Sequence, residues 1–175
     1  MRRWHKFALA GVVAAPLALG AAAKALGLYW NTSPSIPLGL YRATSELVRV
    51  GSYVLLCLPQ GGVFEQAYRR GYLGVGVCPG GAGYVMKRVM AAHGDHVELD
   101  DDGVRVNGQP LPDSAPVRFD GAGRLMPHLQ ATSATLAPDQ VLLMSDRFAL
   151  SFDARYFGPT SRRQIKTVIR PVFTY

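Results

Sequence analysis

Hydrophobic and polar residues divide the chain into an apolar start and a longer section of short alternating runs. Residues 7–23 form an uncharged, mostly apolar stretch of about 17 residues, which is just long enough to cross a bilayer as a helix. Beyond residue 31, short runs rich in β-branched and aromatic residues are separated by glycine and proline turns. The pattern predicts a mainly β fold behind a single N-terminal transmembrane helix, with an anchor in residues 1–30 and one exported domain in residues 31–175.

Turn residues locate the elements of that domain. Asp100-Asp-Asp-Gly103 predicts a hairpin turn between two strands, and Asn107-Gly108 predicts a second tight turn. A short helix is expected at residues 63–72, whereas residues 112–138 lack periodicity and predict an irregular excursion. Pro171 favours an edge position for the last strand, because proline cannot donate to a strand ladder. The predicted strands cover residues 47–58 with a break at 51–52, 81–91, 97–99, 104–106, 141–144 and 165–175.

The residues that flank the apolar stretch predict its orientation. Arg2, Arg3 and Lys6 precede it, which predicts a cytoplasmic N-terminus, and Tyr29-Trp30 follows it as an aromatic pair typical of a membrane interface. The alternative is a cleaved secretory signal, because Ala21-Ala-Ala23 is similar to a small-residue cleavage site. Both interpretations place the rest of the chain outside the cytoplasm.

Composition and charge exclude two classes of protein. A hydrophobic fraction of 49% with 18% charged residues excludes wholesale disorder. A net charge of +7 would ordinarily suggest nucleic acid, but part of it precedes the apolar stretch and no basic stripe with interleaved aromatic residues follows. We therefore expect no nucleic-acid partner, and anionic lipid headgroups explain the charge more simply.

The two cysteines, Cys57 and Cys78, are expected to form one disulfide bond, which is the usual state of a cysteine pair in an exported domain. A metal site would require further soft ligands nearby, and a nucleophilic cysteine would require a partner base. Both alternatives are weaker than the disulfide, and no metal or other cofactor is expected.

Histidine is the usual base for a hydroxyl nucleophile, but none of the four histidines is suitably placed. His5 precedes the apolar stretch, and His128 lies in the irregular excursion. His93 and His96 flank a turn, and the sequence has no Gly-x-Ser-x-Gly nucleophile elbow. A triad built on histidine is therefore disfavoured.

Lysine can replace histidine as a base when burial lowers its pKa toward neutrality, because the ammonium form has no lone pair. Lys87 meets this condition in the predicted strand, where Val85 and Val89 share its face. A charged lysine among apolar neighbours costs free energy unless it is paired. The alternative is a lysine that extends to solvent or pairs with Asp95.

Three segments resemble the motifs of type I signal peptidases, in the order found in that family. Lys87-Arg-Val-Met-Ala-Ala-His-Gly-Asp95, followed by Val104-Arg-Val-Asn-Gly108, resembles the lysine box. Ser33-Pro-Ser-Ile-Pro37 resembles the nucleophile loop, in which a second hydroxyl stands two residues before the reactive serine. Ser145-Asp146 with Ser151-Phe-Asp-Ala-Arg155 resembles the closing motif, and together the segments cover nearly the whole chain.

The resemblance implies a serine endopeptidase with Ser35 as nucleophile and Lys87 as general base. Neutral Lys87 would accept the proton of the Ser35 hydroxyl during attack and later protonate the leaving amine. The Ser35 backbone N–H and the Ser33 hydroxyl would stabilise the oxyanion, although Ser33 also suits a plain turn.

Four further residues of the closing motif are candidates for support. Ser151 would accept a hydrogen bond from Lys87 and orient it, and Asp153 with Arg155 would form an ion pair. Asp146 is a further polar candidate. From the sequence, these residues suit a structural role as readily as a catalytic one.

The match is closer to one branch, the TraF-type conjugative transfer signal peptidases. The nucleophile loop continues as Pro37-Leu-Gly-Leu-Tyr41, the lysine box lacks a Leu-Pro before Gly94-Asp95, and the closing motif continues as Arg155-Tyr-Phe-Gly-Pro159. The placement of Cys57 and Cys78 is also similar to that branch. This resemblance implies a single-pass protein of the bacterial inner membrane with a periplasmic catalytic domain. Its substrate would be a membrane-bound prepilin, which some members of the branch also cyclise.

Two other functions stay open from the sequence. An ordinary leader peptidase would act on many exported preproteins. A non-catalytic, anchored adaptor of a secretion assembly would use its loops to bind partners. The expected partners are thus a prepilin or other membrane-bound preprotein, membrane lipid and the conjugation machinery.

Overall fold

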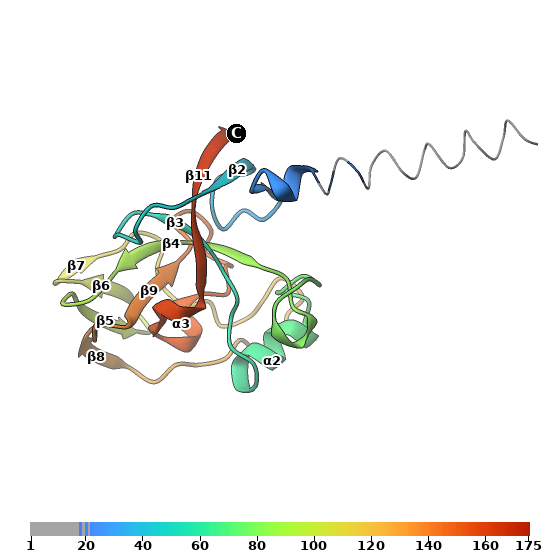
Figure 1. The fold of residues 1–175 in the computed structure, drawn as a ribbon. Helices are drawn as coiled ribbons and strands as arrows, with labels where there is room; N and C mark the ends of the chain where they lie inside the picture. Colours follow the sequence, from blue (N-terminus) through green and yellow to red (C-terminus); the bar gives the residue numbers. More distant parts are fainter. Residues whose placement is uncertain (1–17, 19, 21) are drawn as a thin grey trace, which may run out of the picture.

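Two antiparallel sheets form the framework of the structure, a computed structural model that describes residues 18, 20 and 22–175 (Figure 1). The larger sheet has the strand order β1-β2-β11-β3-β4-β9-β10, and the smaller has the order β7-β6-β5-β8. The strands are β1 (Leu28–Asn31), β2 (Gly39–Thr44), β3 (Tyr53–Leu56), β4 (Val85–Ala91), β5 (His96–Asp100), β6 (Gly103–Val106), β7 (Gln109–Pro110), β8 (Thr132–Thr135), β9 (Gln140–Met144), β10 (Thr160–Ser161) and β11 (Ile165–Thr174). The mainly β architecture agrees with the prediction.

Residues 22–25 are helical and precede β1, and the other helices of the described residues are short and lie between strands. The helix α2 (Gly62–Arg69) overlaps residues 63–72, which were predicted as helical, and α3 (Ala154–Phe157) follows β9. Two single turns of 3₁₀-helix, η1 (Pro79–Gly81) and η2 (Arg162–Gln164), also lie between strands.

Three hydrophobic clusters hold these elements together. The first lies between the larger sheet and α2, and Val89 of β4 and Phe152 belong to it. The second joins the two sheets through residues such as Ala91 and Val97. The third contains Ile36, which is fully buried and directly follows Ser35. Burial of Ile36 therefore fixes the predicted nucleophile loop against the larger sheet.

The turns predicted from the sequence are confirmed. Strands β5 and β6 pair antiparallel from Val97↔Val106 to Asp100↔Gly103. The Asp100 carboxylate accepts backbone N–H bonds from Asp102 and Gly103, which closes the turn. Asn107 and Gly108 both have positive φ, 51° and 77°, as a tight two-residue hairpin turn requires.

Three predictions about the strands were wrong in part. Strand β11 lies between β2 and β3 and is not at an edge. Its pairing with β3 covers only Ile165–Ile169, so the segment around Pro171 pairs with β2 alone and no bond to β3 is lost there. The region predicted as irregular contains β8, which pairs with β5, and the strand predicted from residue 47 begins only at Tyr53.

The close contact between β2 and the end of β11 requires a glycine. Gly39 has a φ of 138°, and a Cβ atom there would collide with the backbone carbonyl oxygen of Phe173. This approach brings the C-terminal strand against the start of β2, directly after the nucleophile loop.

Cys57 and Cys78 form the disulfide bond that export predicts. Cys57 follows β3, and Cys78 belongs to the glycine-rich loop that precedes β4. The bond therefore ties this loop to the larger sheet beside the strand that carries Lys87.

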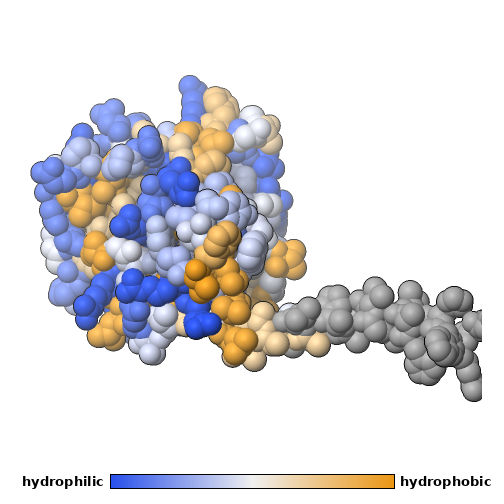
Figure 2. Space-filling model, turned by 90° about the horizontal axis from the view of Figure 1, so that it is seen from above, coloured by the Kyte–Doolittle hydropathy of each residue, from blue (hydrophilic) through white to orange (hydrophobic). Residues whose placement is uncertain are grey.

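Residues 1–17, 19 and 21 of the predicted anchor lie outside the described residues, and among those described no helix is long and apolar enough to cross a membrane. Strand β1 already begins at Leu28, so the larger sheet includes the end of residues 1–30. Figure 2 shows apolar surface beside the point where the chain continues toward its N-terminus. Leu26, Trp30 and Phe173 are among the exposed apolar residues. The anchor, the domain division and the lipid contact stay predictions.

Candidate active site

The loop that carries Ser35 is held by a side chain that sequence reasoning missed, Asn31. Its amide donates hydrogen bonds to the carbonyl oxygens of Ser33, Ile36 and Pro37, at 2.8, 3.1 and 3.0 Å. Its carbonyl oxygen accepts the backbone N–H of Ser33 at 3.0 Å. An asparagine two residues before a Ser-Pro-Ser segment is a local signal for such a turn, and it was available in the sequence.

Lys87 lies in the middle of β4, opposite Val54 of β3, with only 5% of its surface exposed. Val85, Val89 and Val54 all contribute to the first hydrophobic cluster, as the alternation of β4 predicted. The alternative of a pair with Asp95 is wrong, because that carboxylate binds the backbone of Ala92 and the amide of Asn107.

The amine of Lys87 meets two serine hydroxyls that come from distant parts of the chain. Its Nζ lies 2.9 Å from Ser35 Oγ and 2.6 Å from Ser151 Oγ. The two hydroxyl oxygens are 3.1 Å apart. The structure thus brings together the predicted nucleophile, base and orienting residue, all of them buried.

Burial lowers the pKa of Lys87 to about 8. Desolvation of the ammonium is the main cause, the Asp153 charge opposes it, and the Arg155 charge adds to it. Both hydrogen-bond partners of Nζ are neutral hydroxyls, which stabilise the ammonium less than a carboxylate would. A fraction of Lys87 therefore carries the unprotonated amine near neutral pH.

The pH dependence of cleavage is expected to follow this pKa. Below pH about 8 the ammonium form of Lys87 predominates and cannot accept a proton, so kcat/KM should rise about tenfold per pH unit and level off above that value. The measurement is kcat/KM of the full-length enzyme against pH, with thermal unfolding followed over the same range. A flat profile between about pH 6 and pH 9 would argue against Lys87 as the titrating base.

Ser33 lies beside the nucleophile, as its candidate role as an oxyanion donor requires. The Ser33 hydroxyl donates to Ser35 Oγ at 3.1 Å, and the Ser35 backbone N–H donates to Ser33 Oγ at 3.3 Å. Both donors assigned to the oxyanion thus contact each other in the free enzyme. A substrate carbonyl would have to replace these contacts.

Asp153 and Arg155 form a buried ion pair beneath the site. Two parallel hydrogen bonds of 2.8 Å join the guanidinium to the carboxylate, and the side chains are 1% and 0% exposed. The guanidinium also donates to the carbonyl oxygens of Phe148, Ala149 and Ser151. The pair therefore holds the loop that carries Ser151, without a hydrogen bond to Lys87.

Asp146 lies near the site but binds other residues. Its carboxylate accepts hydrogen bonds from the Tyr53 hydroxyl at 2.8 Å and from Arg88 at 3.2 Å. The second carboxylate oxygen is buried without a partner among the described residues. Asp146 thus connects the end of β9 to β3 and β4, which favours a supporting role over a chemical one.

A cleft of about 560 Å³ opens above the three buried groups. Apolar and aromatic side chains line most of its length, and Asp120 and Arg124 lie on its wall. Among the residues that line it are Asn31, Ser33, Ser35, Lys87, Ser151, Trp30, Tyr84, Met126, Phe148 and Phe152. None of the histidines of the described segment lines this cleft. Its volume and its many apolar lining residues suit a stretch of polypeptide.

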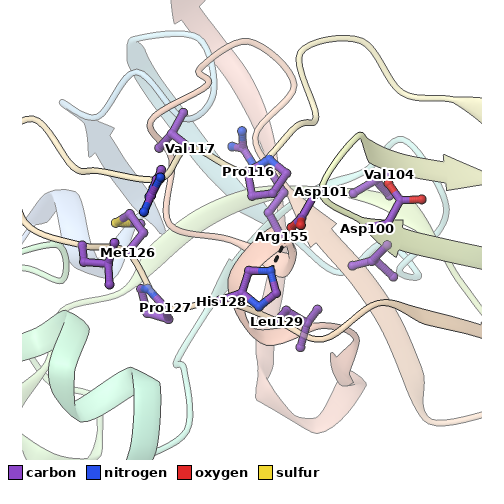
Figure 3. A pocket seen from close by; sticks show the side chains of 13 residues that line it. Asp100, Asp101, Val104, Pro116, Val117, Met126, Pro127, His128, Leu129 and Arg155 are labelled. Carbon is purple, nitrogen blue, oxygen red and sulfur yellow. Dashed lines mark hydrogen bonds and ion pairs between the residues drawn. The ribbon is translucent and has the colours of Figure 1, made fainter.

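A second cavity, of about 430 Å³, lies behind the β5–β6 hairpin (Figure 3). His128 Nε2 and Asp101 Oδ1 meet across it at 2.9 Å, and Arg155 lies behind this pair. No serine, threonine, cysteine or lysine of the described residues lines it. The groups suited to nucleophilic chemistry therefore gather in the first cleft.

Comparisons with known proteins identify the family of this chain. Residues 1–174 match the family described as "Signal peptidase, peptidase S26". The chain is 56% identical to a plasmid transfer protein TraF of Escherichia coli, over the full length of both. It is 38% identical to the conjugal transfer protein TraF of Agrobacterium tumefaciens (strain 15955), over 95% of this chain and 94% of that one. A solved signal peptidase I from Enterococcus faecalis V583 aligns with 71% of this chain and 98% of its own, at 17% identity and a TM-score of 0.38, which is too low to support an argument.

Proposed function

Because this chain belongs to the peptidase S26 family of signal peptidases, we propose that it is a serine endopeptidase with Ser35 as nucleophile and Lys87 as general base. The observation that carries this proposal is the position of the Lys87 amine. It is buried, its pKa is lowered to about 8, and it lies 2.9 Å from Ser35 Oγ. A buried amine in contact with a hydroxyl is the arrangement that activates a serine without histidine.

The proposed reaction has two stages. Neutral Lys87 accepts the proton of the Ser35 hydroxyl while Oγ attacks the scissile carbonyl, and the resulting ammonium then protonates the leaving amine. The acyl group stays on Ser35 until a second nucleophile displaces it. Ser151, at 2.6 Å from Nζ, keeps the amine directed toward Ser35 throughout.

The oxyanion requires two donors on the same side of the reacting carbon. The Ser35 N–H and the Ser33 hydroxyl supply them if the carbonyl oxygen of the substrate takes the place of their mutual hydrogen bond. Asp153 and Arg155 act indirectly, since they hold the backbone of the Ser151 loop.

We further propose that the substrate is the membrane-bound prepilin of a conjugative transfer system. Support comes from relatives named as plasmid or conjugal transfer proteins, which match this chain over nearly their full length. The apolar lining of the cleft is suited to a hydrophobic segment next to the scissile bond. Water would release a linear pilin, whereas the amine at the other end of the same peptide would release a ring.

The test is cleavage by the full-length protein, reconstituted in lipid vesicles with a candidate prepilin. The product mass is compared with that of the linear cleavage product, and a mass lower by one water identifies a ring. An exported preprotein unrelated to pilins is the matched control. Cleavage of the prepilin alone would support the proposal, equal cleavage of both substrates would indicate a general leader peptidase, and cleavage of neither would support the adaptor function.

A further inference from the structure

We propose that Ser145 is a positioning residue that holds the main chain of the nucleophile in its reactive place. The proposal rests on the assignment of Ser35 as nucleophile. The Ser145 hydroxyl donates a hydrogen bond of 2.8 Å to the backbone carbonyl oxygen of Ser35. This bond joins residues 110 positions apart, between the end of β9 and the nucleophile loop.

The orientation of the Ser145 hydroxyl is itself fixed. Its oxygen accepts the backbone N–H of Phe148 at 2.9 Å and that of Arg147 at 3.3 Å. With both N–H groups directed at the oxygen, the hydroxyl hydrogen is free to point toward Ser35. The same side chain therefore closes the turn after β9 and reaches the nucleophile.

The backbone of Ser145 connects this contact to the buried ion pair. Its N–H donates to Asp153 Oδ2 at 3.0 Å, and the same oxygen accepts the guanidinium of Arg155 at 2.8 Å. The ion pair has no hydrogen bond to Ser35 or Lys87 and reaches the nucleophile loop through two residues, Ser145 and Ser151. Ser145 is the one that reaches the main chain of Ser35, whereas Ser151 contacts its side chain. Asp153 and Arg155 therefore affect catalysis by holding the backbone that positions Ser35, and they take no part in proton transfer.

Asp146, the residue after Ser145, is held in place by its side-chain contacts. The Asp146 carboxylate binds Tyr53 of β3 and Arg88 of β4, the residue next to Lys87. Ser145 is therefore anchored by the ion pair on one side and by two core strands on the other. A hydroxyl held this rigidly limits movement of the Ser35 carbonyl, and hence of Oγ relative to the amine.

Loss of the hydroxyl should lower the rate of chemistry more than substrate binding. A displacement of about 1 Å at a reacting group can cost about 10²-fold in rate. We expect Ser145→Ala to lower kcat by about 10–10²-fold with KM unchanged. The pH profile should keep its apparent pKa of about 8, because Ser145 does not contact Lys87. Ser145→Thr keeps a hydroxyl and should restore most of the lost kcat.

Ser114→Ala is the matched control. Ser114 is buried, donates 2.7 Å to the Leu111 carbonyl oxygen and accepts the Val104 N–H at 2.9 Å, but it does not line the catalytic cleft. Its removal should lower the melting temperature about as much as Ser145→Ala does, with kcat unchanged.

The experiment measures kcat, KM, the pH profile and thermal unfolding of the full-length variants in parallel with Ser35→Ala. A Ser145→Ala enzyme with wild-type kcat would overturn the positioning role, and so would a loss of kcat that Ser145→Thr does not restore. If Ser35→Ala itself retains activity, the proposed function fails first. Loss of activity in Ser35→Ala together with full activity in Ser145→Ala would reject the inference alone.

Discussion

Ser35→Ala and Lys87→Ala are each expected to lower the cleavage rate by at least about 10⁴-fold. The first variant removes the attacking oxygen, and the second removes the group that accepts its proton at 2.9 Å. The combined variant should be hardly slower than either single variant, because residues that act as one unit are not additive. The measurement is the initial rate of prepilin cleavage by full-length enzyme at a pH above 8.

Thermal unfolding distinguishes a chemical loss from a loss of fold. Lys87→Met, which replaces a desolvated amine by an apolar side chain of similar length, should be at least as stable as the wild type and equally inactive. Two single variants whose losses multiply in the double variant would show that Ser35 and Lys87 act independently, contrary to the proposed reaction.

Asp153→Ala is expected to lower the free energy of unfolding by about 3–5 kcal/mol. The substitution leaves the Arg155 guanidinium charged and without a counter-ion at 1% exposure. It also removes the acceptor for the N–H groups of Ser145 and Arg155. The measurement is equilibrium unfolding in denaturant.

Glu46→Ala is the matched control for this prediction. The Glu46–Arg170 pair has a short contact of 2.6 Å, but both side chains are exposed to solvent, which screens the charges. Its removal should have a much smaller effect. If Asp153→Ala destabilises the protein no more than Glu46→Ala does, the buried pair does not hold the site together as proposed.

The local part of the fold could be predicted from the sequence. The β5–β6 hairpin is specified by Asp100 and Gly103, which close the turn without help from distant residues. The burial of Lys87 follows from the alternation of apolar residues along β4. The place of β11 in the sheet could not be predicted in this way. It depends on pairing with residues of β2 more than 120 positions earlier, and Pro171 alone suggested an edge.

The site could be predicted only in part for the same reason. Ser35 and Ser151 lie 52 and 64 positions from Lys87, and no periodicity connects them. Only the resemblance to a known family predicted that these three residues share one site. Ser145 acts on the backbone carbonyl of Ser35, and neither residue's type indicates that contact. Asn31 differs, because an asparagine before a turn is a local signal that could have been used.

The rate of prepilin cleavage by full-length Lys87→Arg tests the central claim most directly. Arginine keeps a positive charge at the position but cannot lose its proton, so it separates a general base from a cation that only stabilises charge. Thermal unfolding of the variant establishes that it is folded. The account predicts a folded enzyme without detectable cleavage, even above pH 8, whereas cleavage at a rate near that of the wild type would contradict Lys87 as the base.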